Sequence, residues 1–153
     1  MAKLLPEILE NSEILVADDF EMKFSNIPVK RHKTLQNVKS HIVKNILTPI
    51  RETDSSLKGQ DCVILIESTF LRGEYRGKED LRELLIIRDV EELSESNVGD
   101  SANKLRYSSI LKFKGLEKKN VYLVISTPSE LNKYEIYIGI TRAILNVEIN
   151  IVE

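Results

Sequence analysis

Continuous runs of apolar residues alternate along the chain with segments in which apolar residues recur every three or four positions. The run Cys62–Ile66, bounded by polar residues, is typical of a strand buried on both faces of a mainly parallel sheet. Residues 105–111 and 120–126 predict two more strands, and the alternating residues 146–152 predict a closing strand. A shorter apolar run at residues 13–17 predicts a further strand near the start of the chain.

The helical period is clearest over residues 35–50, where Thr34 is placed to cap the N-terminus and Pro49 is expected to end or kink the helix. Residues 78–87 carry acids in their first turn and predict a second, short helix. Residues 127–130, TPSE, have the composition of a capping box, so a third helix is expected to begin there and to run towards Arg142.

The segments between these elements are polar. Residues 24–33 contain Asn26, Pro28 and a basic cluster and predict a connecting loop, and residues 91–104 predict a mobile loop. Residues 1–12 have no strong pattern and are expected to form a short helix or an ordered tail. The alternation of strands and helices favours a three-layer α/β fold with a mostly parallel sheet.

Composition limits the chain to one domain and excludes several classes of protein. Its 153 residues are 42% hydrophobic and 30% charged, which is enough for one core. The net charge is -2, so any contact with nucleic acid must come from a local patch. No apolar stretch approaches the roughly 20 residues that span a bilayer, and no secretion signal is present, so we expect a soluble cytoplasmic protein without a membrane partner.

The sequence lacks the usual signatures of a self-contained enzyme. Cys62 lies inside an apolar run and is expected to be a buried thiol, and His32 and His41 have no other ligands at suitable spacing, so no metal site is predicted. There is no G-x-x-x-x-G-K-[ST] phosphate-binding loop and no G-x-S-x-G nucleophile elbow. The chain therefore cannot supply the main phosphate cradle for a nucleotide.

Two segments in the second half carry a resemblance to a known family. Residues 109–117, SILKFKGLE, followed by VYLV, resemble motif V of the UvrD/Rep-type superfamily 1 DNA helicases, and residues 137–143, YIGITRA, resemble motif VI. The two segments occur in the order of the family and at a compatible distance. The resemblance covers about residues 105–152, and residues 35–66 are similar only in architecture. It implies a RecA-like domain, the C-terminal half of a helicase motor, without a phosphate-binding loop of its own.

The resemblance also implies a ligand and a partner. ATP with Mg²⁺ would lie in the cleft between this domain and a missing N-terminal RecA-like domain, supplied in cis or in trans. Arg142 would reach the γ-phosphate as an arginine finger, since a guanidinium offers several donors to phosphoryl oxygens. Glu117 would accept hydrogen bonds from the ribose, and Gly115 would allow the close approach or positive φ that the turn demands. Alone, such a domain is expected to hydrolyse no ATP.

Single-stranded DNA is the second ligand that the resemblance implies. Ser109 takes the place of a threonine of the family beside the DNA backbone, whereas Leu111 replaces a histidine and puts DNA coupling at that point in doubt. A local phosphate-tracking patch is expected from four lysines of this segment, Lys112, Lys114, Lys118 and Lys119.

Simpler interpretations stand beside these roles. Arg142 can be a surface arginine paired with a carboxylate, Glu117 a solvated turn residue, and Gly115 the closing residue of a hairpin. The whole chain can also be a non-enzymatic, helicase-like module that binds a partner protein.

A receiver-like signalling domain is a further alternative, because residues 13–17 are followed by the paired acids Asp18 and Asp19, which could hold Mg²⁺. That pattern wants an aspartate at the end of a later strand, where this chain has Glu67.

Overall fold

The structure is a computed structural model that describes residues 27–52, 55–71, 81, 90–99, 102–113 and 115–153. In this part of the chain, six strands form one sheet in which every neighbouring pair is parallel. The order across the sheet is β1-β6-β5-β2-β4-β3. The strands are β1 (Val29–His32), β2 (Cys62–Ile66), β3 (Glu91–Glu92), β4 (Arg106–Ser109), β5 (Lys118–Ser126) and β6 (Ala143–Val152).

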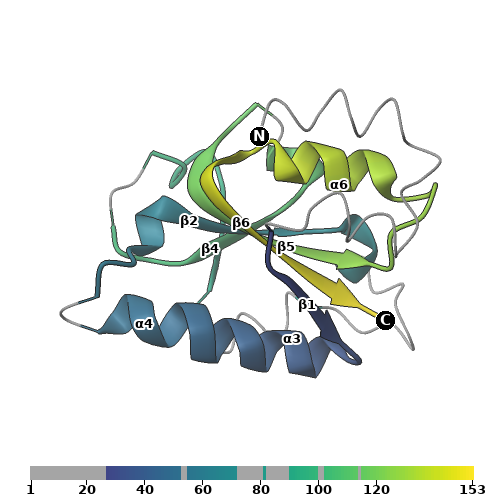
Figure 1. Cartoon of the computed structure of the whole chain (residues 1–153). Helices are drawn as coiled ribbons and strands as arrows, with labels where there is room; N and C mark the ends of the chain where they lie inside the picture. The colour runs from purple at the N-terminus through teal and green to yellow at the C-terminus, as the bar shows by residue number, and fades with distance from the viewer. Residues whose placement is uncertain (1–26, 53–54, 72–80, 82–89, 100–101, 114) are drawn as a thin grey trace.

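Helices cover both faces of this sheet, which gives three layers (Figure 1). On one face lies a continuous helix made of α3 (Leu35–Ile42), a π-helical turn (Val43–Leu47) and α4 (Thr48–Arg51). On the other face lies α6 (Lys133–Ile140). The predicted three-layer α/β class with a parallel sheet is therefore confirmed. Among the described residues, no helix has the length and apolar character needed to cross a bilayer.

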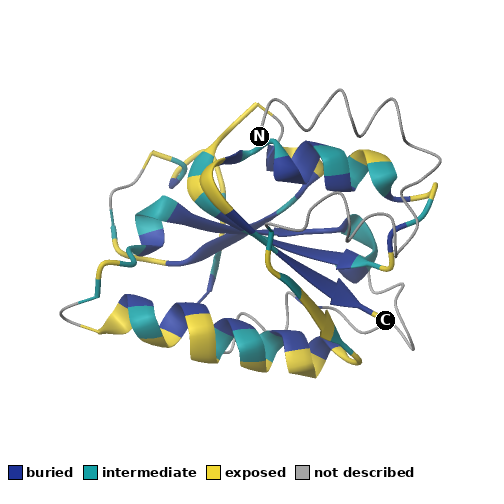
Figure 2. Cartoon of the chain, in the orientation of Figure 1, coloured by how far each residue is buried: buried dark blue, intermediate teal, exposed yellow. Residues whose placement is uncertain are grey.

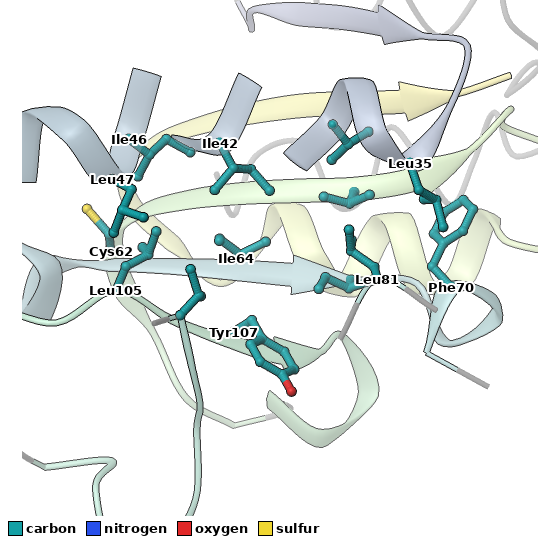
Figure 3. Packing of buried hydrophobic residues seen from close by; sticks show 14 of the residues in the cluster. Leu35, Ile42, Ile46, Leu47, Cys62, Ile64, Phe70, Leu81, Leu105 and Tyr107 are labelled. Carbon is teal, nitrogen blue, oxygen red and sulfur yellow. The ribbon is translucent and has the colours of Figure 1, made fainter. Parts of the chain in front are cut away.

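The core consists of two apolar layers, one on each face of the sheet. Strand β2 contributes to both layers and is buried along its whole length (Figure 2). One layer lies under α6 and includes Val63, Leu65 and Phe113. The other lies under α3 and α4, where side chains of the helix meet those of the sheet (Figure 3). Since β2 pairs with β5 on one side and with β4 on the other, both of its edges and both of its faces are buried. A continuous apolar run is what such a position requires.

The helix from residue 35 to residue 51 agrees with the sequence pattern in its start and in its apolar face. Thr34 adopts an extended conformation, and its hydroxyl accepts a hydrogen bond from the backbone N–H of Asn37 at 3.1 Å, so the predicted cap is confirmed. The π-helical turn immediately precedes α4, where Pro49 occupies the first turn. Proline has no N–H and its ring crowds the preceding turn, which accounts for the wider hydrogen-bonding pattern before it.

Three predictions about elements were wrong in detail. Residues 29–32 form the edge strand β1, although the polar sequence predicted a loop; backbone pairing of Val29 with Ile149 holds this strand at the rim. Helix α6 begins at Lys133 rather than near residue 127, because Asn132 closes a turn by accepting a hydrogen bond from the backbone N–H of Ser129 at 2.9 Å. Finally, the alternative in which Gly115 closes a hairpin is excluded, since β2 lies between β4 and β5.

Some predictions fall on parts of the chain with little or no description. The strand at residues 13–17, the segment 1–12 and most of the helix at residues 78–87 lie outside the described residues, apart from Leu81, which is helical and buried. The range predicted as a mobile loop begins with β3 and continues into a hydrogen-bonded turn at residues 94–98. Its mobility stays a prediction.

Gly59 offers a test of the packing that sets the start of β2. A Cβ at this position would lie 2.4 Å from the backbone carbonyl carbon of Lys104, and a backbone cannot yield as a side-chain tip does. We expect Gly59→Ala to lower the free energy of unfolding by about 1–3 kcal/mol, measured by urea denaturation. Gly99→Ala is the control, because no atom of the described residues lies within 4 Å of its added Cβ, and its effect should stay below about 0.5 kcal/mol. Equal effects would contradict this account.

The thiol of Cys62 should be inert in the folded protein. Burial raises the pKa of this thiol to about 11, and the thiolate is the reactive form. At pH 8 we expect alkylation of the native protein to be slower than that of the urea-unfolded chain by at least about a hundredfold, and to accelerate as the pH approaches 11. Because the folded thiol keeps its proton to higher pH, the stability that depends on it is complete below the unfolded pKa and is lost as the pH rises above it. Equal alkylation rates of native and unfolded protein at pH 8 would show that Cys62 is accessible.

Candidate functional site

The pairing of β5 with β6 brings the two motif-like segments together. Glu117 directly precedes β5, and Arg142 directly precedes β6. The backbone N–H of Lys118 donates to the carbonyl oxygen of Arg142 at 3.0 Å, and Lys118 pairs with Ala143 in the sheet. Because parallel strands begin at the same edge, the residues before them become neighbours there. We call this rim, with Glu117 and Arg142, the amino edge of the sheet.

The guanidinium group of Arg142 is hydrogen-bonded to an uncharged hydroxyl, that of Thr141. Its Nε and Nη2 atoms donate to Thr141 Oγ1 at 3.2 and 2.9 Å, and this hydroxyl donates to the carbonyl oxygen of Ile138 at 2.7 Å. Within the described part of the chain, no carboxylate lies at ion-pair distance from the guanidinium. The alternative of a surface arginine paired with a carboxylate therefore finds no partner among these residues, and the positive charge stays available to an anion.

Close packing of α6 against β5 sets the position of Arg142. A Cβ at Gly139 would lie 2.4 Å from Leu123 Cδ2, so only glycine allows the helix to lie at this distance from the strand. Leu123 is fully buried and has little room to move. Gly139, in the YIGITRA segment, thus sets how close α6 lies to β5. Since Arg142 follows the end of α6, the same packing sets the position of Arg142.

Gly115 and Glu117 form the turn that leads into β5. Gly115 has φ of +90°, which confirms the prediction of a positive φ, but it makes no close approach, since nothing lies within 4 Å of an added Cβ. The turn is closed by a hydrogen bond from the backbone N–H of Leu116 to the carbonyl oxygen of Phe113 at 3.1 Å. Glu117 is exposed and makes no hydrogen bond with any described residue, so its carboxylate is accessible.

Ser109 and Lys112 lie at the other rim, where the strands end, which we call the carboxyl edge. The hydroxyl of Ser109 accepts a hydrogen bond from the backbone N–H of Lys112 at 3.2 Å. Both residues line a hollow of about 220 Å³ between the ends of β2, β3 and β4. Leu111, in the same short 3₁₀ segment, exposes 42% of its surface. The carboxyl edge is the usual ligand-binding edge of a parallel sheet.

The predicted patch of four lysines does not form one surface. Lys118 and Lys119 are the first two residues of β5, at the amino edge. There Lys118 Nζ donates to the carbonyl oxygen of Gln60 at 2.8 Å, and Lys119 Nζ lies 3.8 Å from Asp61 Oδ1. Lys112 lies at the carboxyl edge instead. Lys118 and Lys119 are therefore at the opposite edge of the sheet from Lys112. Lys114 lies outside the described residues.

The main role that sequence reasoning missed is that of Glu67, which was considered from the sequence only in the place of a receiver aspartate. Its side chain is only 4% exposed, and it follows β2 directly. Four groups donate to its carboxylate, and together they join the ends of β2, β5 and the turn before α6. These donors are Thr69 Oγ1 at 2.6 Å, Ser126 Oγ at 2.9 Å, Ser126 N at 3.1 Å and Asn132 Nδ2 at 2.9 Å. A charged residue directly after a fully apolar run was the available signal.

These contacts do not favour the receiver-like alternative. The carboxylate of Glu67 is enclosed by donors from the protein itself, and Asp18 and Asp19 lie outside the described residues. Within the described ranges there is no cluster of three or more potential metal ligands. His32 and His41 contact polar partners instead: His32 Nε2 lies 2.9 Å from Asn150 Oδ1, and His41 Nε2 lies 2.6 Å from an oxygen of Glu148.

Comparison with known proteins identifies a structural neighbour. No family model matches the chain, and no curated protein matches it. Among solved structures, it is similar to the C-terminal domain of a possible DNA helicase from Lactobacillus plantarum WCFS1, with a TM-score of 0.57 and 16% sequence identity. The match covers 82% of this chain and 73% of that chain. At this identity the likeness shows the fold, and the α/β fold predicted for a RecA-like helicase C-terminal domain is confirmed.

Removing the charge of Glu67 should destabilise the carboxyl edge. In Glu67→Gln, one side-chain oxygen becomes an NH₂ group that faces donors, so hydrogen bonds to a charged acceptor are lost inside the protein. We expect the free energy of unfolding to fall by about 2–4 kcal/mol, measured by denaturant unfolding. Glu130→Gln is the matched control, since Glu130 is exposed and pairs with Lys133 on the surface. Equal losses in both variants would contradict the proposed role of Glu67.

Proposed function

We propose that this chain is the C-terminal motor domain of a UvrD/Rep-type, ATP-dependent DNA helicase or translocase. The observation that carries the proposal is the geometry of the amino edge, where Glu117 and Arg142 precede adjacent strands and Arg142 has no carboxylate partner in the described part of the chain. The likeness to the C-terminal domain of a possible DNA helicase supports it.

ATP with Mg²⁺ is the substrate in this proposal. The phosphate cradle and the metal ligands come from an N-terminal RecA-like domain, in the same polypeptide or in a second chain, because this sequence contains no phosphate-binding loop. Arg142 donates hydrogen bonds to the γ-phosphate and offsets the charge that develops on its oxygens during transfer. Glu117 accepts hydrogen bonds from the ribose hydroxyls. The positive φ of Gly115 fixes the turn that presents Glu117.

Single-stranded DNA binds at the carboxyl edge in the same proposal. The hydroxyl of Ser109 and the ammonium groups of Lys112 and Lys114 contact the phosphate backbone. Leu111 offers only an apolar contact, so the lysines and Ser109 carry the coupling to DNA. ATP binding closes the two domains of the motor on each other, and this movement shifts the carboxyl edge along the strand.

The experiment that tests the proposal is an ATPase assay on the complex with the domain that carries the phosphate-binding loop. We expect Arg142→Ala to lower kcat by a factor on the order of 10³–10⁵, because the γ-phosphate loses its charge-stabilising donor. Arg31→Ala is the control: it removes the same charge from an exposed arginine that pairs with Glu153 at 3.1 Å on the far rim of the sheet, and it should keep the rate. Wild-type activity in Arg142→Ala would contradict the finger assignment. The chain alone should hydrolyse no ATP.

A second candidate is a helicase-like module that binds a partner protein without catalysis. Exposed apolar side chains favour it: Leu111 at the carboxyl edge, and Ile144 and Leu145 in the first residues of β6. The two candidates differ in their response to nucleotide. The motor domain binds its partner more tightly when ATP is present, whereas the module binds with the same affinity in either condition, which calorimetric titration distinguishes.

A further inference from the structure

The hollow at the carboxyl edge has a composition suited to one flat polar ring. Its volume is about 220 Å³, below the roughly 300–1,000 Å³ of sites for drug-sized ligands. The hollow therefore suits a ligand fragment smaller than a whole drug molecule. Its lining combines apolar and aromatic residues, including Leu71, Leu93 and Tyr107, with polar and charged ones, including Glu92, Ser109 and Lys112.

The outer wall of this hollow is held in place by a buried amide. Asn97 is 7% exposed; its Nδ2 donates to Glu91 Oε1 at 2.6 Å and to the carbonyl oxygen of Glu92 at 3.0 Å, while its Oδ1 accepts from the backbone N–H of Ser94 at 2.8 Å. The backbone N–H of Leu93 donates to the carbonyl oxygen of Tyr107 at 2.8 Å. The short strand β3 and the turn after it are thus fixed before any ligand arrives.

Tyr107 orients the carboxylate of Glu92. The phenol oxygen of Tyr107 points away from the aliphatic side chains around it (Figure 3), and it donates to Glu92 Oε2 at 3.3 Å. A carboxylate in this position repels a phosphate group. Lys112 lines the same hollow, and its positive charge attracts one. A nucleotide therefore suits this site with its base inside the hollow and its phosphate outside, near Lys112.

We infer that the hollow binds one base of the DNA strand and that it prefers guanine. This inference rests on the proposed function, because the strand brings the base to the site. Guanine presents two adjacent donors, N1–H and the N2 amino group, which a single carboxylate can accept side by side. Adenine and cytosine place an acceptor beside their amino group, and thymine has a single ring donor. Guanine is the base whose paired donors match the Glu92 carboxylate, while Lys112 contacts the phosphate.

The test compares strands that differ by one amino group. Fluorescence anisotropy of the whole chain with labelled oligothymidylate is measured with a single central guanine, or with hypoxanthine, which lacks the N2 amino group. We expect the guanine strand to bind tighter by a factor on the order of ten, since a good bidentate contact to a base discriminates by about that much. In Glu92→Gln the two strands should bind equally, because the amide oxygen offers one acceptor and the NH₂ group opposes a donor.

Glu95→Gln is the matched control. Glu95 lies three residues further on in the same segment, is exposed, and lines the neighbouring hollow rather than this one. Its variant removes the same charge near Lys112 and should raise the affinity for all strands equally while keeping the preference for guanine. A preference that vanishes in both variants would mean that charge alone, and not contact with Glu92, sets it, and would overturn the inference.

Two outcomes separate this inference from the proposed function. Equal, salt-dependent binding of guanine and hypoxanthine strands by the unaltered chain would overturn the base site and leave DNA binding intact. If no strand binds, guanosine and inosine are titrated separately and the amide NMR shifts of residues 92–98 are followed. This measurement decides whether the hollow binds a base at all. Shifts with guanosine alone would support the base site and overturn DNA as the ligand, and no shifts with either nucleoside would overturn both.

Discussion

The parallel register between β5 and β6 is the constraint on which the candidate site depends. It pairs Lys118 with Ala143 and continues to the pair of Ser126 with Val152. Since the strands run in the same direction, the residues immediately before them meet at one rim, although they lie far apart in the sequence. Glu117 and Arg142 are neighbours for this reason alone. A change in this register would separate them, whatever happened to their own side chains.

Helix α6 makes this arrangement rigid because it is held at both ends. At the carboxyl edge, Glu67 accepts a hydrogen bond from Asn132, the residue before the helix, and Glu135 accepts hydrogen bonds from the backbone N–H and the hydroxyl of Ser68. At the amino edge the helix passes directly into Arg142 and β6. A buried carboxylate with several donors is stable in only one arrangement, so the first turn of the helix has a defined position.

The sequence predicted those parts of the fold whose burial is visible locally. The apolar run of β2 and the helical period after Thr34 report burial directly, so both were correct. Contacts between distant residues left no such signal. The polar edge strand β1 exists through backbone pairing with β6, and Asn132, which closes the turn before α6, is also held by Glu67, 65 residues away. For the candidate site, the residue types followed from the family resemblance, but their division between two edges required the register of the sheet.

The segment between Ser109 and Glu117 sets the position of the two edges relative to each other. Ile110 and Phe113, which follow β4 in the sequence, are both fully buried in the core layer under α6. Close-packed cores deform little, so Ser109 at one end of this segment cannot move relative to Glu117 at the other without disturbing that packing. The domain therefore transmits displacement as a rigid body. In the proposed motor, a step along a strand would therefore arise from movement between this domain and a second one, with the hinge outside the core described here.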